Sequence, residues 1–162
     1  MSKVVFSLDS FINITKSINF LMKDYNITLN FEGFTDTINS FYSLDINDDY
    51  DAWCLEKDFL LWDIYCSSLY QVIEYIKNDL LTICNKRISQ LSLYYSEDDK
   101  QFGNTFAHRD NIVQEYIKKI KIFETYIKEL DLQLQTIVKA TQQCKYIYIN
   151  SITNFNRNIY SI

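Results

Sequence analysis

Residues 113–148 read VQEYIKKIKIFETYIKELDLQLQTIVKATQQCKYIY. An apolar residue recurs there every three or four positions, which is the repeat that places side chains on one face of an α-helix. This stripe consists of Val113, Tyr116, Ile120, Phe123, Ile127, Leu130, Leu134, Ile137, Thr141, Cys144 and Tyr148, and ten of the eleven positions are apolar. We therefore predict one long amphipathic helix over residues 113–148.

A second stripe of the same kind precedes the first. It contains Phe59, Trp62, Cys66, Leu69, Ile73, Ile76, Leu80 and Ile83, and then shifts by one residue to Cys84, Ile88, Leu91 and Tyr95. This pattern predicts a helix of about ten turns with a kink or stutter near residues 83–85. Residues 96–104 are polar and include Gly103, so we expect them to form a loop that joins the two helices into an antiparallel hairpin.

The first thirty residues predict shorter elements. Apolar residues at helical spacing favour a helix over residues 7–25, with Asp9 or Ser10 as its N-terminal cap. Residues 27–31 alternate between apolar and polar, which suits either a short strand or an extended link. Gly33 ends that segment.

The remaining segments complete a predicted single domain over residues 1–162. Residues 35–44 fit a short helix, residues 45–51 form an acidic loop, and the Asn-rich tail from Asn150 suits a frayed end or a cap. The chain has no proline and two glycines, so few residues force a helix to stop. We predict an all-α fold: a helical bundle built on the long hairpin, with the N-terminal helices packed on its open face.

The composition is that of a globular protein, with 48% hydrophobic and 23% charged residues. The richness in aromatic residues, Ile and Asn is typical of translation from an AT-rich genome, as in a virus, a phage or a low-GC bacterium. We find neither a secretory leader nor an apolar run long enough for a membrane span. A cytoplasmic location with reduced thiols is the resulting expectation.

The four cysteines are Cys54, Cys66, Cys84 and Cys144, and no two have the C-x-x-C spacing of zinc or redox motifs. The last three fall on the apolar stripes, where a reduced cysteine behaves as a small hydrophobic residue. We expect them to be core residues.

One acidic segment resembles a calcium-binding loop in its spacing. Asp45, Asn47, Asp49 and Glu56 stand at positions 1, 3, 5 and 12 of a twelve-residue run between two predicted helices. Position 6 requires glycine for a sharp turn with positive φ, but the residue there is Tyr50. We therefore interpret the segment as a solvated acidic linker, and predict no metal and no cofactor.

The run Gly103-Asn104-Thr-Phe-Ala-His108-Arg109-Asp110 stands where the predicted loop enters the second long helix. It resembles the motif of the HEPN superfamily, above all its abortive-infection branch, with Asn104 in the polar place and His108 in the histidine place. The resemblance implies a four- to five-helix bundle in which an Arg and a His from each of two protomers line a cleft and cut RNA without metal. Histidine can serve there as general acid or base, and arginine can neutralise charge that develops on the phosphate.

The chain departs from that motif at one position. Gly103 stands where the family has its catalytic Arg, so the second role is empty unless Arg109 or Lys100 takes it. The competing interpretation is that His108 begins a helix and that Asn104 and Asp110 satisfy local hydrogen bonds.

Six lysines lie along the second long helix, at positions 118, 119, 121, 128, 139 and 145. They could meet phosphates while tyrosines stack on bases. However, most tyrosines there lie on the apolar stripe, which favours core packing. The net charge of −5 also argues against general nucleic-acid binding, although residues 109–162 carry eight Lys/Arg against five Asp/Glu, or +3, and the remainder carries −8.

Taken together, these patterns favour binding over catalysis. The predicted function is a protein-interaction module of viral, phage or defence origin, which binds a protein partner or a second copy of itself. The alternative is a HEPN-like, metal-independent RNase or a catalytically degenerate, RNA-binding relative that uses His108, Asn104, Arg109 and Asp110. A virion or phage structural component is a weaker alternative, and neither DNA nor a membrane is an expected partner.

Overall fold

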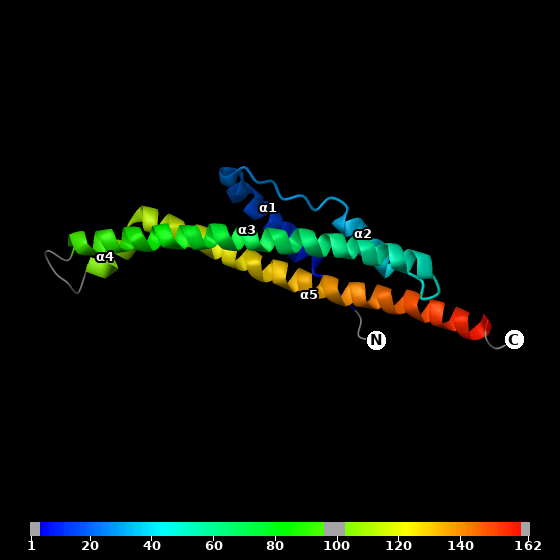
Figure 1. Cartoon of the computed structure of the whole chain (residues 1–162). Coiled ribbons are helices and arrows are strands. Elements are labelled where there is room, and N and C mark those ends of the chain that lie inside the picture. The colour runs from blue at the N-terminus through cyan, green and yellow to red at the C-terminus, as the bar shows by residue number, and fades with distance from the viewer. Residues whose placement is uncertain (1–3, 96–102, 160–162) are drawn as a thin grey trace.

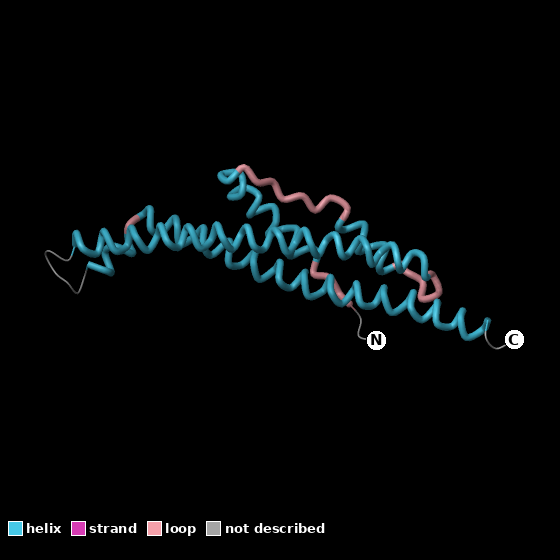
Figure 2. Tube along the Cα trace, in the orientation of Figure 1, coloured by secondary structure: helices cyan, strands magenta, loops and turns pink. Residues whose placement is uncertain are grey.

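The computed structural model describes residues 4–95 and 103–159, except for the side chains of Asn104 and of residues 154–159. Its elements in chain order are α1 (Leu8–Met22), the 3-10 helix η1 (Lys23–Tyr25), α2 (Phe34–Tyr42), α3 (Asp49–Tyr95), α4 (Gly103–Arg109) and α5 (Asn111–Ile159). Every regular element of these residues is helical, which confirms the predicted all-α class (Figure 2).

The fold is built on a hairpin of two very long helices. α3 has 47 residues and α5 has 49, and the two run side by side as a gently curved rod (Figure 1). At about 1.5 Å per residue, each helix is about 70 Å long. Neither helix contains glycine or proline, so no residue interrupts the backbone hydrogen bonds. The predicted antiparallel hairpin is confirmed.

The start of α3 is set by acidic residues. The Asp48 carboxylate accepts a hydrogen bond from the Asp51 N–H at 3.0 Å, and the Asp48 carbonyl accepts from the Ala52 N–H at 3.1 Å. Asp49 and Asp51 lie in the first turn, where the helix dipole favours negative charge. The acidic loop predicted over residues 45–51 is therefore too long, because its last three residues belong to the helix.

The two short helices add a third layer along part of the rod. α1 packs on α5, and α2 packs on α3 (Figure 1). Aromatic rings join the layers in three stacked pairs, with centroids 5.9–6.0 Å apart: Phe6 with Phe59, Phe11 with Tyr126, and Phe31 with Trp62. These contacts confirm that the N-terminal helices cover the hairpin.

The first helix begins earlier than its predicted caps. α1 begins at Leu8, so Asp9 and Ser10 lie inside its first turn, and Ser7 takes the N-cap position without a side-chain bond. α1 ends at Met22, and η1 continues it to Tyr25 and ends where Asn26 adopts a left-handed backbone conformation with φ of 56°.

Residues 27–31 form an extended link and not a strand. The link is held by a side chain: the Asn19 amide oxygen accepts from the Leu29 N–H at 2.9 Å, and the Asn19 amide nitrogen donates to the Leu29 carbonyl at 3.3 Å. Gly33 then starts α2 with φ of 83°, a conformation that glycine adopts without steric cost.

The stripe shift in α3 is visible in the burial of two neighbouring residues. Ile83 is 41% exposed, whereas Cys84 is 2% exposed. The helix remains continuous through this point, so the one-residue shift is accommodated without a break.

The buried side of α5 is wider than the predicted stripe. Val113, Ile120, Phe123, Leu130, Ile137 and Cys144 are buried as predicted. Tyr126, Gln133, Thr136, Ala140 and Ile147 are buried as well, although they lie outside that stripe. Of these, Tyr126 is covered by α1, where its ring stacks on Phe11 and its hydroxyl lies 3.2 Å from that of Thr15.

Two predicted boundaries near the ends of α5 are wrong. The tail from Asn150 is not frayed, because α5 continues to Ile159 and the Ser151 hydroxyl bonds the Asp49 carboxylate at 3.1 Å. Gly103 and Asn104 belong to α4 and not to the predicted loop. The rest of that loop, with Lys100, lies outside the described residues.

No helix of the described residues combines the length and apolar character that a bilayer span requires.

Candidate functional site

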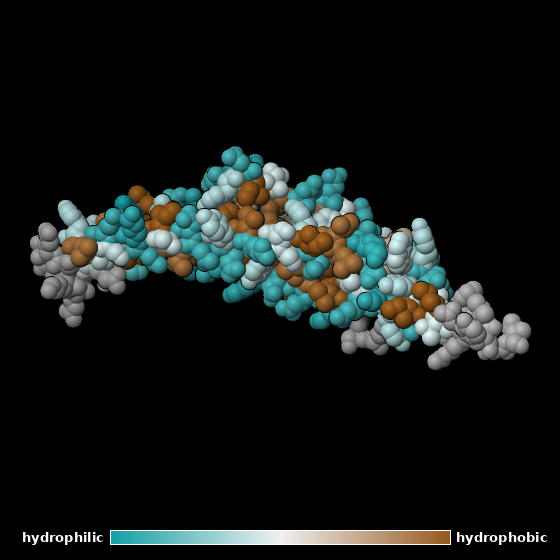
Figure 3. All heavy atoms as spheres, in the orientation of Figure 1, coloured by the Kyte–Doolittle hydropathy of each residue, from teal (hydrophilic) through white to brown (hydrophobic). Residues whose placement is uncertain are grey.

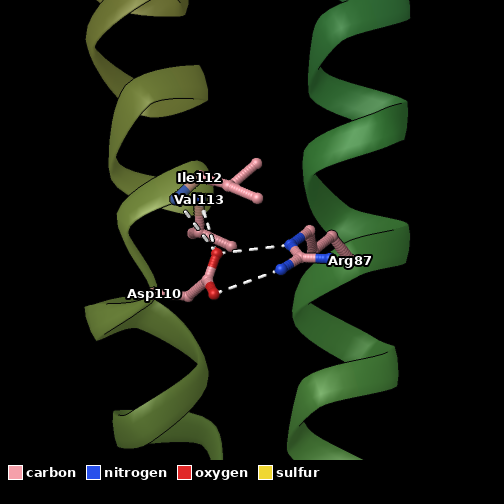
Figure 4. A network of polar contacts seen from close by, with 4 residues as sticks. All are labelled: Arg87, Asp110, Ile112 and Val113. Carbon is pink, nitrogen blue, oxygen red and sulfur yellow. Dashed lines mark hydrogen bonds and ion pairs between the residues drawn. The ribbon is translucent and has the colours of Figure 1, made fainter.

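The junction of α4 and α5 is organised by Asp110. Its carboxylate accepts two hydrogen bonds from Arg87 of α3, from Nε and Nη2, each at 3.2 Å (Figure 4). The same carboxylate accepts from the N–H groups of Ile112 and Val113 at 3.1 Å, so it also caps α5. These bonds, with that from Arg87 the largest cause, lower the pKa of Asp110. Asp110 therefore links the junction of α4 and α5 to α3, and it caps the start of α5.

The other residues of the HEPN-like run lie on α4, at one end of the rod. The side chains of His108 and Arg109 are exposed, and the Arg109 guanidinium carbon lies 6.0 Å from the ring centroid of Phe106. The His108 carbonyl accepts a hydrogen bond from the Gln114 amide. Asn104 lies in the first turn of α4. The run thus occupies one short helix, and its aspartate is engaged by Arg87.

Sequence reasoning missed Arg87 as the partner of Asp110. The two residues are 23 positions apart, on facing helices. The sequence offered one indication of this contact, namely that Arg87 is a charged residue near the end of the predicted hairpin.

The calcium-like segment does not gather its expected ligands. Asp49 and Glu56 both lie in α3, and Glu56 is buried, with its carboxylate 3.8 Å from the ammonium of Lys57. Asp45 accepts hydrogen bonds from the backbone and the side chain of Asn47 at 2.9 and 3.1 Å, which forms a local turn. Within residues 4–95 and 103–159, no group of three or more His, Cys, Asp and Glu side chains could hold a metal ion.

The cysteines lie where the stripes predicted. Cys66, Cys84 and Cys144 are buried free thiols, and Cys54 is half-buried. Burial, together with nearby carboxylates, raises the pKa of Cys66 and of Cys144 to about 12. Because the thiolate is the reactive form, these buried thiols are unreactive in the folded protein.

Tyr126 and Lys119 of α5 are engaged by other side chains of the molecule. Tyr126 is fully buried, and its hydroxyl lies 3.2 Å from the Thr15 hydroxyl. Lys119 forms ion pairs with Asp24 at 4.0 Å and with Glu115 at 3.6 Å. Core packing therefore holds for Tyr126, whereas Tyr116 and Tyr148 of the stripe are half-buried and Tyr146 is 54% exposed.

One side of α3 exposes several large apolar residues at helical spacing. Leu61, Ile64, Val72 and Tyr75 are 66%, 63%, 40% and 75% exposed. Their spacing places them on one side of α3, away from the buried stripe that contains Phe59 and Cys66. We call this side the outer face of α3 and define it by seven exposed residues: Lys57, Leu61, Ile64, Ser68, Val72, Tyr75 and Asp79.

The outer face adjoins a shallow pocket between α2 and α3. The pocket has a volume of about 360 Å³ and is lined by Gly33, Thr37, Asp58, Leu61, Trp62 and Tyr65. Hydrophobic side chains also reach the surface along the middle of the rod (Figure 3). Sequence reasoning missed this face, although its three- and four-residue spacing was a readable signal.

No protein-family model matches the chain, and no characterised protein or solved structure shows significant similarity to it. The function must therefore be argued from the surface of the molecule.

Proposed function

We propose that the protein is an interaction module that binds a helix of a partner protein through the outer face of α3. A helix on the surface of a soluble protein normally carries polar residues on its solvent side. α3 instead exposes Leu61, Ile64 and Tyr75 by more than 60% each, and they lie within four turns of one another. Clustered exposed apolar residues of this kind mark binding surfaces. This cluster is the observation that carries the proposal.

The geometry of the outer face suits a helical partner. Four apolar side chains, at positions 61, 64, 72 and 75, follow one edge of a rigid helix over about 21 Å. A second amphipathic helix presents side chains at the same three- and four-residue spacing, so the two rows can interdigitate.

The charge around this face disfavours nucleic acid as its partner. Residues 32–63 contain nine Asp or Glu residues and one basic residue, Lys57. A phosphate backbone would meet net negative charge at that end of the rod, which opposes the electrostatic attraction that drives nucleic-acid binding. A partner recognised by apolar contact fits better.

The RNase alternative rests on a different part of the molecule. His108 and Arg109 are exposed neighbours at the end of α4, and this is the observation in its favour. Its test is cleavage of a structured RNA in EDTA by the wild type and by His108→Ala. Cleavage that the substitution abolishes would support this alternative, and no cleavage by either protein would oppose it.

The interaction proposal is tested by a photo-crosslinking amino acid in the cells that make the protein. We expect position 64, on the outer face, to give an adduct of discrete mass, and Leu61→Asp in the same chain to remove it. Position 128 is the matched control, because Lys128 is exposed on α5. Absence of an adduct at position 64, with far-UV circular dichroism showing a folded helical protein, would contradict the proposal.

A further inference from the structure

The outer face of α3 has the same spacing when it is read in either direction. Its positions are 57, 61, 64, 68, 72, 75 and 79, separated by four, three, four, four, three and four residues. The middle position is Ser68. A second copy laid antiparallel across this point would place Leu61 opposite Tyr75, Ile64 opposite Val72, and Ser68 opposite Ser68.

We propose that the partner bound by this face is a second copy of the same chain, with the two α3 helices antiparallel and a two-fold axis at Ser68. This inference rests on the proposed function and names its partner. In a two-fold interface, a residue that contacts a second residue of the other copy is matched by the same contact with the two copies exchanged. The symmetric spacing about Ser68 satisfies that requirement for every residue of the face.

The central position is suited to close helix approach. Ser68 is small, and its hydroxyl donates a hydrogen bond to the Ile64 carbonyl of its own helix at 2.8 Å. The hydroxyl therefore brings no unpaired donor into the contact. On both sides of Ser68, the β-branched residues Ile64 and Val72 would pack against each other in the same way.

The pocket beside Leu61 offers a place for an aromatic ring. In the antiparallel arrangement, Tyr75 of the second copy lies opposite Leu61, which lines that pocket together with Trp62 and Tyr65. Tyr75 is 75% exposed, so its ring is available for such a contact. An aromatic side chain inserted into a pocket is a common anchor of protein interfaces.

The ends of the face carry complementary charges. Lys57 stands at one end and Asp79 at the other, and both are exposed. In the antiparallel pair each Lys57 meets the Asp79 of the other copy. A parallel pair would instead oppose Lys57 to Lys57 and Asp79 to Asp79, which is repulsive. The charges therefore select the antiparallel orientation.

The size of the face indicates a weak contact. The strip is about 33 Å long and about one helix diameter, or roughly 10 Å, wide. Such a strip is smaller than the roughly 800 Å² per partner of a standard interface. We expect a reversible dimer with a dissociation constant of about 1–100 μM.

Charge exchange tests the proposed orientation. Lys57→Glu and Asp79→Lys should each weaken self-association by about tenfold in sedimentation velocity, because each variant opposes like charges at both ends of the face. An equimolar mixture should restore the association of the wild type, since both contacts in the mixed dimer are then attractive. A mixture no tighter than the single variants would overturn the antiparallel pairing.

A disulfide at the axis provides the second readout. In a Cys54→Ser background, Ser68→Cys should form a covalent dimer when diamide oxidises the two thiols, because the two positions face each other. Ser89→Cys is the matched control, since Ser89 is an exposed residue of α3 whose hydroxyl bonds the preceding turn in the same way, at 2.9 Å. Equal cross-linking at the two positions, or none at position 68, would overturn the proposal.

The two proposals fail in distinguishable ways. An adduct at position 64 with a different protein, together with no cross-link at position 68, would leave the interaction function standing and remove the homodimer. Absence of both would remove the interaction function as well.

Discussion

The two halves of the hairpin are held together differently. In the covered half, the N-terminal third layer contacts Phe59 and Trp62 of α3 and Tyr126 of α5, and Phe59 and Tyr126 are fully buried rings. In the distal half, residues 77–95 of α3 face α4 and the start of α5, and Ile88 and Leu91 are only half-buried. The fully buried residues of the distal half are small, such as Cys84, Ala107 and Val113, whereas the large buried rings lie where α1 and α2 add a third layer.

The distal half is joined by polar bonds at its centre. The double hydrogen bond between Arg87 and Asp110 connects α3 to the start of α5. Such a contact fixes the relative position of the helices, but it buries little apolar area, so it contributes less to stability than the aromatic core. We therefore expect most of the stability to reside in the covered half.

The largest predicted effect comes from a core substitution in the covered half. Phe59→Ala should lower the free energy of unfolding by about 3–5 kcal/mol, because it leaves a cavity among buried rings. Leu91→Ala, in the distal half, should cost less than about 2 kcal/mol, because Leu91 is half-buried. Urea unfolding measures both, and equal costs would remove the distinction between the halves.

A stabilising substitution is predicted at Gln133. This residue is fully buried, and neither polar atom of its amide has a hydrogen-bond partner among the described residues. Gln133→Met keeps the side-chain length and removes the unpaired groups, so stability should rise by about 1–3 kcal/mol.

The exposed Gln135 serves as the control for that experiment. Its amide bonds the Asp131 carboxylate at 2.8 Å on the surface. Gln135→Met should change stability by less than about 0.5 kcal/mol. A loss of stability in Gln133→Met would show that its amide is paired in solution.

The polar contact of the distal half can be separated into its two roles. Asp110→Ala removes the helix cap and the Arg87 contact, and should lower the melting temperature by about 2–4 °C. Asp110→Asn keeps a capping oxygen and loses the ion pair, so its effect should be smaller. A larger loss in Asp110→Asn than in Asp110→Ala would contradict the assigned roles.

The same residue predicts a dependence on pH. The pKa of Asp110 is lowered in the folded protein, chiefly by the hydrogen bond from Arg87. Its stabilising contribution is therefore present above the unfolded pKa of about 3.9 and is lost as the pH falls through the lower folded pKa. Melting curves of the wild type and Asp110→Asn should be separate above about pH 5 and draw together as the pH falls below the unfolded pKa of about 3.9.

The smallest effect concerns the order in which the thiols react. Half-buried Cys54 should react first with a thiol reagent, and buried Cys66 and Cys144 should react last. Cys84 should fall between them, because it lies in the distal half, where local opening costs less free energy. Mass spectrometry of labelled peptides measures this order, and simultaneous reaction of the three buried thiols would show that the halves open together.

The long helices could be predicted because two kinds of information agreed. The apolar stripes gave the helical repeat, and the absence of glycine and proline allowed the helices to continue. The shift of the buried stripe from Ile83 to Cys84 could also be predicted, because the apolar spacing itself changes by one residue there. The burial of Tyr126 could not be predicted, because it depends on where α1 packs, and no local pattern records that position.

The candidate sites also depend on contacts between distant segments, which local sequence patterns do not record. Nothing in the sequence near Asp110 indicates that Arg87 would engage it across the hairpin. The outer face of α3 was readable in principle, since Leu61, Ile64 and Tyr75 have helical spacing. A stripe of apolar residues does not itself reveal whether another element of the chain will cover it, and only the packed fold shows these residues exposed.

Small-angle X-ray scattering across a concentration series tests the central claim that α3 is a docking surface for a second copy. Ser68 lies near the middle of α3, so the paired rods overlap along their length. We predict that, from about 1 to 200 μM, the average scattering mass rises from that of one chain toward that of two, while the maximum dimension stays near that of one rod. A monomer at every concentration, or a dimer about twice as long, as contact between the ends that carry His108 would give, would contradict the account.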